Sequence, residues 1–288
     1  MQTTTALVSV IIPCYNQGAF VMDALASVAA QTYVHWEAIV VNDGSTDAAT
    51  VALLAELQFP QTRVLHTSNM GLAQARNNGI AEAKGTYILP LDADDTIAST
   101  YIEKAVAQFE KHPTTILVYS KAAFFGTETG EWLLPDFSMQ TMLQQNVIFC
   151  SAMFRKYDFE KVGGYATYMR YGWEDWDLWL RMLTNGGLVY RIPEVLFYYR
   201  KHAVSMVGDI AADTAKRAFL EQQLVMHHAA LYQQYYPEPI TMLRRYHQLQ
   251  QEKLQFENVK QQIYSSMSYQ LGAALLWPFK QLQRLFNK

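Results

Sequence analysis

The 288-residue sequence has few cysteines, little net charge and no long apolar run. Its two cysteines, Cys14 and Cys150, lie far apart and form no C-x-x-C motif, so we expect neither a disulfide framework nor a structural zinc site. The formal net charge of −3 argues against nucleic acid as a partner and against an acidic disordered chain. No apolar run reaches the roughly 18 to 20 residues of a membrane-spanning helix, and the N-terminus lacks the basic segment of a signal peptide. We therefore expect a folded protein of the reducing cytoplasm.

Short apolar runs alternate with helical patterns in the first third of the chain. The expected strands are Leu7–Ile12, Trp36–Val41, Arg63–His66 and Tyr87–Leu91, and the expected helices are Gln17–Ala30, Ala48–Leu57 and Leu72–Ala83. Pro13 is expected to end the first strand. Strands that are apolar along their length are typical of a sheet buried on both faces. The alternation predicts an α/β fold with a doubly wound, mostly parallel sheet.

Polar side chains follow each of these expected strands. The four clusters read PCYN, NDGSTD, TSNMG and DADD. In parallel sheets, ligands bind in the crevice beyond the carboxyl ends of the strands. Polar loops and helix caps would explain any single cluster, but four clusters at one edge predict a ligand-binding site.

The segment LDADD gathers the carboxylates of Asp92, Asp94 and Asp95 within four positions. Like charges this close repel unless a cation or hydrogen-bond donors neutralise them. Asp92 and Asp94 are one residue apart, so both can face one ligand in an extended loop. Because Mg²⁺ usually takes one or two carboxylates and completes its shell with water and substrate phosphates, the segment predicts a metal diphosphate site. An acidic surface cluster is the alternative.

Two further clusters contain candidate ligand-binding residues. In NDGSTD, Asp47 is expected to cap the next helix, which leaves Asp43 free to accept a hydrogen bond from a base or sugar. In NMGLAQARNNG, Arg76 could meet a phosphate or sugar oxygen with its planar guanidinium. The alternative for Arg76 is an ordinary surface arginine.

An acidic pair, Glu174 and Asp175, follows Gly172 and Trp173 at an expected helix N-terminus. Acidic residues are favoured in the first turn of a helix, which is one explanation. The other is a general base that takes a proton from an incoming hydroxyl while a metal stabilises the departing phosphate.

Five segments carry a family resemblance: VSVIIPCYN, VVNDGSTD, NMGLAQARNNGI, LDADD and WEDWDLWLRM. Their order and approximate spacing resemble those of the inverting family 2 glycosyltransferases, which have the GT-A fold, from about Val8 to Ser205. The resemblance implies that Asp43 binds the nucleotide base, Asp92 the ribose or sugar, and Asp94 the Mn²⁺ or Mg²⁺ of a nucleotide diphosphate-sugar.

The same resemblance assigns the catalytic and remaining binding residues. It implies that Asp175 is the catalytic base, that Glu174 contacts the acceptor or orients the site, and that His202 in YYRKHAVSM reaches the metal and diphosphate. The other expected donor contacts are Pro13, Tyr15, Asn16, Asn69, Gly71, Arg76 and Ala93, and Trp173 is expected to contact the acceptor with Glu174.

The resemblance predicts a metal-dependent inverting glycosyltransferase that moves a sugar, with UDP as the expected nucleotide, to a hydroxyl of a glycan or lipid-linked acceptor in bacterial surface polysaccharide synthesis. A non-catalytic nucleotide-sugar or glycan-binding module is the alternative. A sugar nucleotidyltransferase is less supported, because PCYNQGAF contains no basic residue and no repeated glycine. An oligomer of identical chains is compatible with the sequence.

Two domains are expected. Residues 1–208 would form the GT-A domain, with a nucleotide-sugar half (1–100) and an acceptor half (101–208), and residues 209–288 a helical C-terminal extension. At the end of this extension, apolar and basic residues fall on opposite helix faces. The apolar face comprises Phe279, Leu282 and Phe286, and the basic face Lys280, Arg284 and Lys288. Such a helix could hold the protein peripherally on the inner face of the cell membrane or dock on protein.

Overall fold

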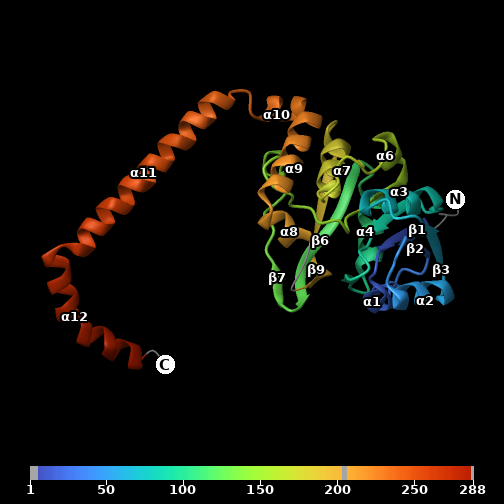
Figure 1. Cartoon of the computed structure of the whole chain (residues 1–288), viewed down its shortest axis with the longest axis horizontal. Coiled ribbons are helices and arrows are strands. Elements are labelled where there is room, and N and C mark those ends of the chain that lie inside the picture. Colours follow the sequence, from blue (N-terminus) through green and yellow to red (C-terminus); the bar gives the residue numbers. More distant parts are fainter. Residues whose placement is uncertain (1–5, 203–205, 287–288) are drawn as a thin grey trace. The chain divides into compact units, whose positions relative to one another are not determined.

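The computed structural model describes the backbone of residues 6–202 and 206–286, and the side chains of 6–202, 208–272 and 274–277 (Figure 1). The chain divides into two compact units, Met1–Tyr232 and Gln233–Lys288. This division falls later than the predicted boundary at residue 208, which remains a prediction. Leu220, Leu224 and Leu231 are buried, so the helices that carry them pack within the first unit.

Within its described residues, the first unit is built on a nine-stranded sheet. The strands are β1 (Val8–Cys14), β2 (Trp36–Asp43), β3 (Thr62–Thr67), β4 (Tyr87–Pro90), β5 (Thr96–Ile97), β6 (Thr115–Gly126), β7 (Gly130–Trp132), β8 (Met153–Arg155) and β9 (Leu188–Lys201). The helices are α1 (Gly18–Ala29), α2 (Ala48–Glu56), α3 (Leu72–Glu82), α4 (Tyr101–Lys111), α5 (Met139–Met142), α6 (Lys156–Lys161), α7 (Glu174–Leu183), α8 (Met206–Ala212), α9 (Thr214–His227) and α10 (Ala229–Tyr235).

The sheet is mixed, and its long ladders are parallel. The strand order is β3-β2-β1-β4-β8-β6-β9-β5, and β7 pairs with β6. Strands β3, β2, β1 and β4 are parallel neighbours, and β6 is parallel to β9. The short β8 is antiparallel to both β4 and β6, so these two parallel groups run in the same direction. The prediction of a doubly wound, mostly parallel α/β sheet is confirmed.

The sequence explains where the core lies. Every residue of β1 is buried, as its continuous apolar run predicts. The prediction that Pro13 ends this strand is wrong, because β1 reaches Cys14 and pairs there with β2. Pairing with β4 stops at Ile11, and by the alternation of the strand the nitrogen of Pro13 faces this unpaired side. The missing N–H therefore costs no ladder hydrogen bond.

The second unit contains the helices α11 (Pro239–Ser265) and α12 (Met267–Phe286). No residue of α11 is buried. The two faces predicted for the C-terminal tail begin after Trp277 and lie outside the described side chains. No helix in the described part of the chain combines the length and the apolar composition that crossing a membrane requires.

Candidate functional site

The carboxyl ends of β1, β2, β4 and β9 meet at one edge of the sheet, because all four strands run in the same direction. This topology brings His202, which follows β9, to the loop that follows β4. His202 Nε2 lies 2.8 Å from Asp94 Oδ2, although 108 positions separate the two residues. The two predicted metal ligands are thus neighbours.

The loop after β1 is fastened to the loop after β2. The side-chain oxygen of Asn16 accepts hydrogen bonds from the backbone N–H groups of Thr46, at 2.8 Å, and Asp47, at 2.9 Å. Asp47 Oδ2 in turn accepts the N–H of Thr50 at 2.8 Å, which confirms its predicted role as a helix cap. Tyr15 is 46% exposed at this edge, whereas Pro13 is buried in β1.

Asp43, at the end of β2, holds the third loop in place. Its Oδ1 accepts the N–H of Met70 and its Oδ2 that of Gly71, both at 3.0 Å, and the residue is only 3% exposed. Each oxygen of this carboxylate thus already accepts one backbone N–H, and the expected hydrogen bond from a base or sugar stays a prediction. Gly44 has a positive φ of 65°, and a Cβ there would lie 2.5 Å from the backbone nitrogen of Asn69. Glycine at this position permits the close approach of the two loops.

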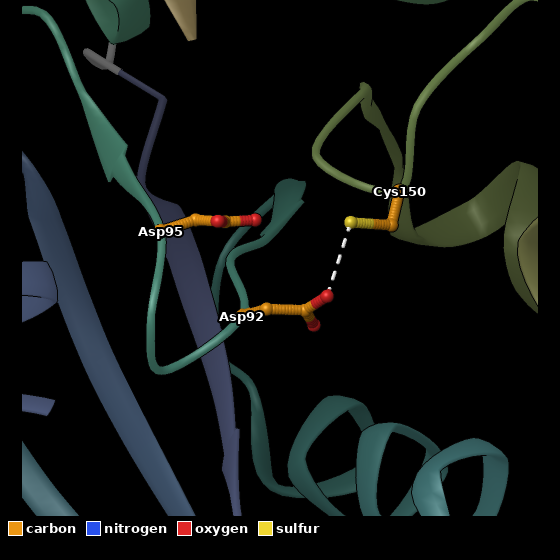
Figure 2. A group of neighbouring side chains, drawn as sticks. All are labelled: Asp92, Asp95 and Cys150. Carbon is orange, nitrogen blue, oxygen red and sulfur yellow. Dashed lines mark hydrogen bonds between the residues drawn. The ribbon is translucent and has the colours of Figure 1, made fainter. Parts of the chain in front are cut away.

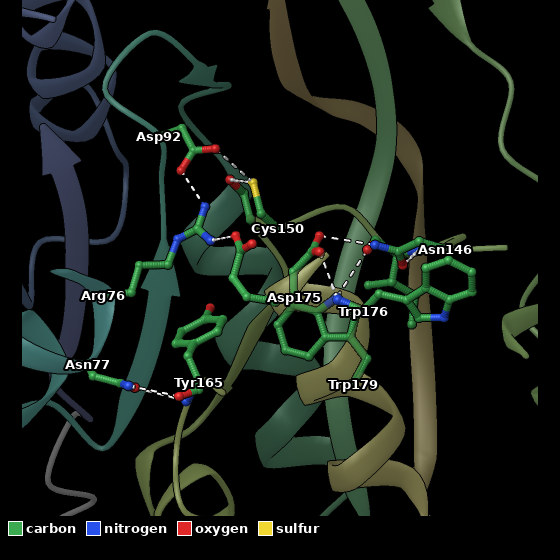
Figure 3. Close-up of polar contacts among 12 residues, drawn as sticks. Arg76, Asn77, Asp92, Asn146, Cys150, Tyr165, Asp175, Trp176 and Trp179 are labelled. Atoms are coloured by element: carbon green, nitrogen blue, oxygen red, sulfur yellow. Dashed lines mark hydrogen bonds and ion pairs between the residues drawn. The ribbon is translucent and has the colours of Figure 1, made fainter. Parts of the chain in front are cut away.

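Arg76 on α3 is buried, and it joins the loop after β4 to α7. Its Nη2 donates to Asp92 Oδ1 at 2.5 Å, and its Nη1 donates to Glu174 Oε1 (Figure 3). The side chain is 1% exposed. Burial lowers the pKa of Arg76, but the charges of Asp92 and Glu174 outweigh that effect and raise it. The alternative of an ordinary surface arginine is wrong, because the side chain is buried and two of its nitrogens bind carboxylates of the chain. The expected contact of Arg76 with the donor stays a prediction.

Glu174 begins α7 and is nearly as buried as Arg76, with 5% of its surface exposed. Its ion pair with Arg76 explains how a carboxylate is held at this depth. Of the two roles predicted for Glu174, this geometry favours orientation of the site over contact with the acceptor.

Asp175 is the neighbouring carboxylate, and it is only partly buried. Its Oδ2 accepts a hydrogen bond from Asn146 Nδ2 at 3.0 Å, and its Oδ1 accepts the backbone N–H of Trp176 at 2.7 Å (Figure 3). Burial and the charge of Glu174 raise the pKa of Asp175 to about 7, although Arg76 opposes the shift. A carboxylate with this pKa is a better proton acceptor than an ordinary aspartate. Trp173 precedes the pair with a φ of 61°, and it is half-buried.

Acidic groups gather beyond β4, next to a thiol. Figure 2 shows Asp92 and Asp95 pointing toward Cys150, and one ligand atom from each lies within 4.8 Å of the others. Cys150 donates to Asp92 Oδ2 at 3.3 Å, and Asp95 Oδ1 accepts the N–H of Arg200 at 2.8 Å. This group includes neither Asp94 nor His202. Ala93, between the acidic residues, is fully buried.

The residues in this loop fit a divalent cation. Asp95 is 1% exposed, and its Oδ2 has no hydrogen-bond partner among the described residues. Burial, Asp92 and Asp94 raise the pKa of Asp95, and burial and Asp92 raise that of Asp94. A buried, unpartnered carboxylate oxygen in a repelling cluster is the kind of group that a hard cation stabilises.

Residues 9–171 match the family described as "Glycosyl transferase family 2". The chain belongs to this family. Residues 139–205 also match the "N-terminal domain of galactosyltransferase". The predicted family and its enzyme class, glycosyltransferase, are confirmed.

Relatives and solved structures agree with this membership. The chain is 30% identical to the putative glycosyltransferase EpsE of Bacillus subtilis over 67% of this chain and 73% of that protein. It is 32% identical to the glycosyltransferase GlyG of Streptococcus pneumoniae, but there the match spans only about half of each chain (49%). The S. aureus TarS 1-349 structure in complex with UDP-GlcNAc superposes with a TM-score of 0.59 at 17% identity, and covers 77% of this chain and 72% of that chain. This likeness confirms the predicted GT-A fold.

Replacing Arg76 with methionine should destabilise the first unit. The substitution leaves Asp92 and the buried Glu174 without their shared partner, and removal of one member of a buried ion pair costs about 3 to 5 kcal/mol. Urea denaturation would measure the free energy of unfolding. Lys104→Met breaks a partly exposed pair with Glu194 and serves as the control, with an expected loss of about 0 to 1 kcal/mol. Equal losses would contradict a central role for Arg76.

Asp175→Asn should stabilise the metal-free protein, and more at pH 8 than at pH 5. The pKa of Asp175 is raised from 3.8 to about 7 in the folded state. As the pH rises, the carboxyl group of Asp175 therefore loses its proton in the unfolded chain before it does so in the folded protein. The free energy of unfolding falls as the pH rises from 3.8 to about 7, and it stays low above that range. Asparagine cannot ionise, so the variant escapes this loss. We expect a gain in Tm of roughly 2 to 8 °C at pH 8, measured by calorimetry with a chelator present. A gain that is equal at both pH values would show that Asp175 has an ordinary pKa.

Proposed function

We propose that this protein transfers a sugar from a nucleotide diphosphate-sugar, with UDP as the nucleotide, to a hydroxyl group of a glycan or lipid-linked acceptor, with inversion at the anomeric carbon. The observation that carries the proposal is the position of Asp175. It lies across Arg76 and Glu174 from the acidic loop after β4, and its raised pKa suits a general base. The similar S. aureus TarS structure is a complex with UDP-GlcNAc, which supports a UDP-sugar donor here.

The donor would lie at the carboxyl edge of β1, β2 and β4. Asp43 shapes this part of the site by holding Met70 and Gly71, and Tyr15 is exposed there. Asp94 and His202 would hold a Mn²⁺ or Mg²⁺, with Asp92 and Asp95 close by. A bound divalent cation would neutralise charge on the diphosphate as it leaves.

The transfer step needs one base. Asp175 would take the proton of the acceptor hydroxyl as the oxygen forms a bond to the anomeric carbon. The bond between that carbon and the diphosphate breaks, and the nucleoside diphosphate leaves with the bonding electron pair. Asn146, through its hydrogen bond to Oδ2, would hold the carboxylate in line with the acceptor.

The setting would be the synthesis of a bacterial surface polysaccharide, in the cytoplasm or at its membrane face. Both described cysteines are free thiols, which agrees with a reducing compartment. The alternative, a binding module without turnover, predicts donor binding with no sugar transfer.

Asp175→Asn should abolish transfer while the affinity for UDP stays within about twofold, because the substitution removes the base and keeps the side-chain shape. In the wild type, the rate of transfer should rise with pH to a plateau, with an apparent pKa of about 7. Release of UDP from a UDP-sugar would report turnover. Asp136→Asn, at an exposed aspartate, is the matched control. Near-normal transfer by Asp175→Asn would overturn the assignment of the base.

Asp94→Ala should remove the metal-dependent part of nucleotide binding. Calorimetric titration with UDP, GDP and CDP, each with and without Mn²⁺, would measure the affinities. We expect UDP to bind more tightly with Mn²⁺ in the wild type and equally with and without Mn²⁺ in the variant. Absence of binding by all three nucleotides, in a protein with intact secondary structure by circular dichroism, would overturn the donor assignment.

A further inference from the structure

A cavity of about 510 Å³ lies beside Asp175, and nothing in the donor site uses it. It is partly open to solvent and is lined by the segment that follows α5, the start of α7, and helices α9 and α10. Among the residues around it are Gln145, Asn146, Trp173, Trp176, Glu221 and Tyr232. Its volume falls within the range of about 300 to 1,000 Å³ that is usual for small-molecule sites.

The chemistry of the wall selects a neutral, hydroxylated ligand. The rings of Trp173 and Trp176 lie 5.1 Å apart at an angle of 58° and offer aromatic faces for the apolar side of a ring. Amide groups of Gln145 and Asn146 and the carboxylate of Glu221 can bond hydroxyl groups. No lysine or arginine is among the described residues that line the cavity, and the carboxylate of Glu221 already has a counter-charge in Arg217 at 3.9 Å, so the lining offers no unpaired cation to a phosphate.

Two residues that line the cavity also contact the proposed base. Asn146 faces the cavity and also donates to Asp175 Oδ2 at 3.0 Å. Trp176 faces it and donates its backbone N–H to Asp175 Oδ1 at 2.7 Å. Asp175 itself does not line the cavity. A ligand seated there would therefore lie next to the accepting hydroxyl, at the far side from the donor.

The wall is held in shape before any ligand binds. Trp176 Nε1 donates to the carbonyl of Met142 at 2.6 Å, and the hydroxyl of Tyr232 donates to the carbonyl of Leu143 at 2.9 Å. Asp177 on α7 lies 2.9 Å from His228 at the junction of α9 and α10, and both side chains are buried. Preorganisation of this kind reduces the entropic cost of binding.

The geometry points to a second acceptor subsite. The cavity binds the sugar residue next to the one that accepts the new bond, so the acceptor is an uncharged glycan of at least two sugar residues and not a single sugar on a phosphate-bearing carrier. This inference rests on the proposed function, because it takes Asp175 as the base.

The test uses the full-length protein on a printed array of neutral oligosaccharides, sugar phosphates and oligosaccharides that contain uronic acids. The strongest ligand is then titrated by calorimetry in the presence of UDP and Mn²⁺. Trp173→Ala removes an aromatic face, and Val225→Arg fills the cavity from a position that is 50% exposed and therefore tolerant of substitution. Val51→Arg, on α2 at a position that is 41% exposed and does not line the cavity, is the matched control.

We expect neutral glycans of two or more residues to be bound, with a loss of affinity of about tenfold or more in Trp173→Ala and Val225→Arg and no change in Val51→Arg. Preferred binding of sugar phosphates or uronic acids would overturn the inference, as would equal affinities in all variants. Absence of glycan binding while the wild type still binds UDP with Mn²⁺ would overturn it and leave the proposed donor site standing. Loss of UDP binding in the wild type would instead contradict the proposed function.

Discussion

The buried guanidinium of Arg76 is the constraint on which the candidate site depends. A charge at this depth is stable only when it is paired, and here two carboxylates share it. One of them follows β4 and the other begins α7, so Arg76 fixes the distance between the acidic loop after β4 and the helix that carries Asp175. The planar fork of arginine suits this task better than the ammonium of lysine, because it meets two carboxylates in fixed directions.

The ion pair between Arg76 and Glu174 gives two adjacent carboxylates, Glu174 and Asp175, different surroundings. Glu174 forms an ion pair with Arg76, whereas the described hydrogen-bond partners of Asp175 are neutral, namely Asn146 and a backbone N–H. Burial and the charge on Glu174 raise the pKa of Asp175. Two adjacent carboxylates thus have different electrostatic surroundings within one turn of a helix.

The sequence predicted the elements whose signals are local. Apolar runs located β1 and β2, and the cap at Asp47 was readable from its neighbours. Because parallel strands end at one edge, the position of the acidic loop after β4 could also be predicted. Contacts between residues that lie far apart in the sequence could not be predicted. Arg76 finds Glu174 98 positions away, and nothing near either residue marks the other as its partner.

Two contributors to the site had no detectable signal. Asn146 and Cys150 belong to the irregular segment before β8, where neither periodicity nor a turn motif indicates which side chains face inward. β8 itself has three residues, too few for a strand pattern, yet its antiparallel insertion between β4 and β6 sets the direction of the second half of the sheet.

One wall of the cavity beside Asp175 comes from α9 and α10, which lie beyond the residues 9–171 that match the family. With the cavity as an acceptor subsite, part of the choice of acceptor is encoded beyond the stretch that matches the family. Exchange of α9 and α10 between related enzymes would then be a route to new glycan linkages that leaves the nucleotide-sugar unchanged.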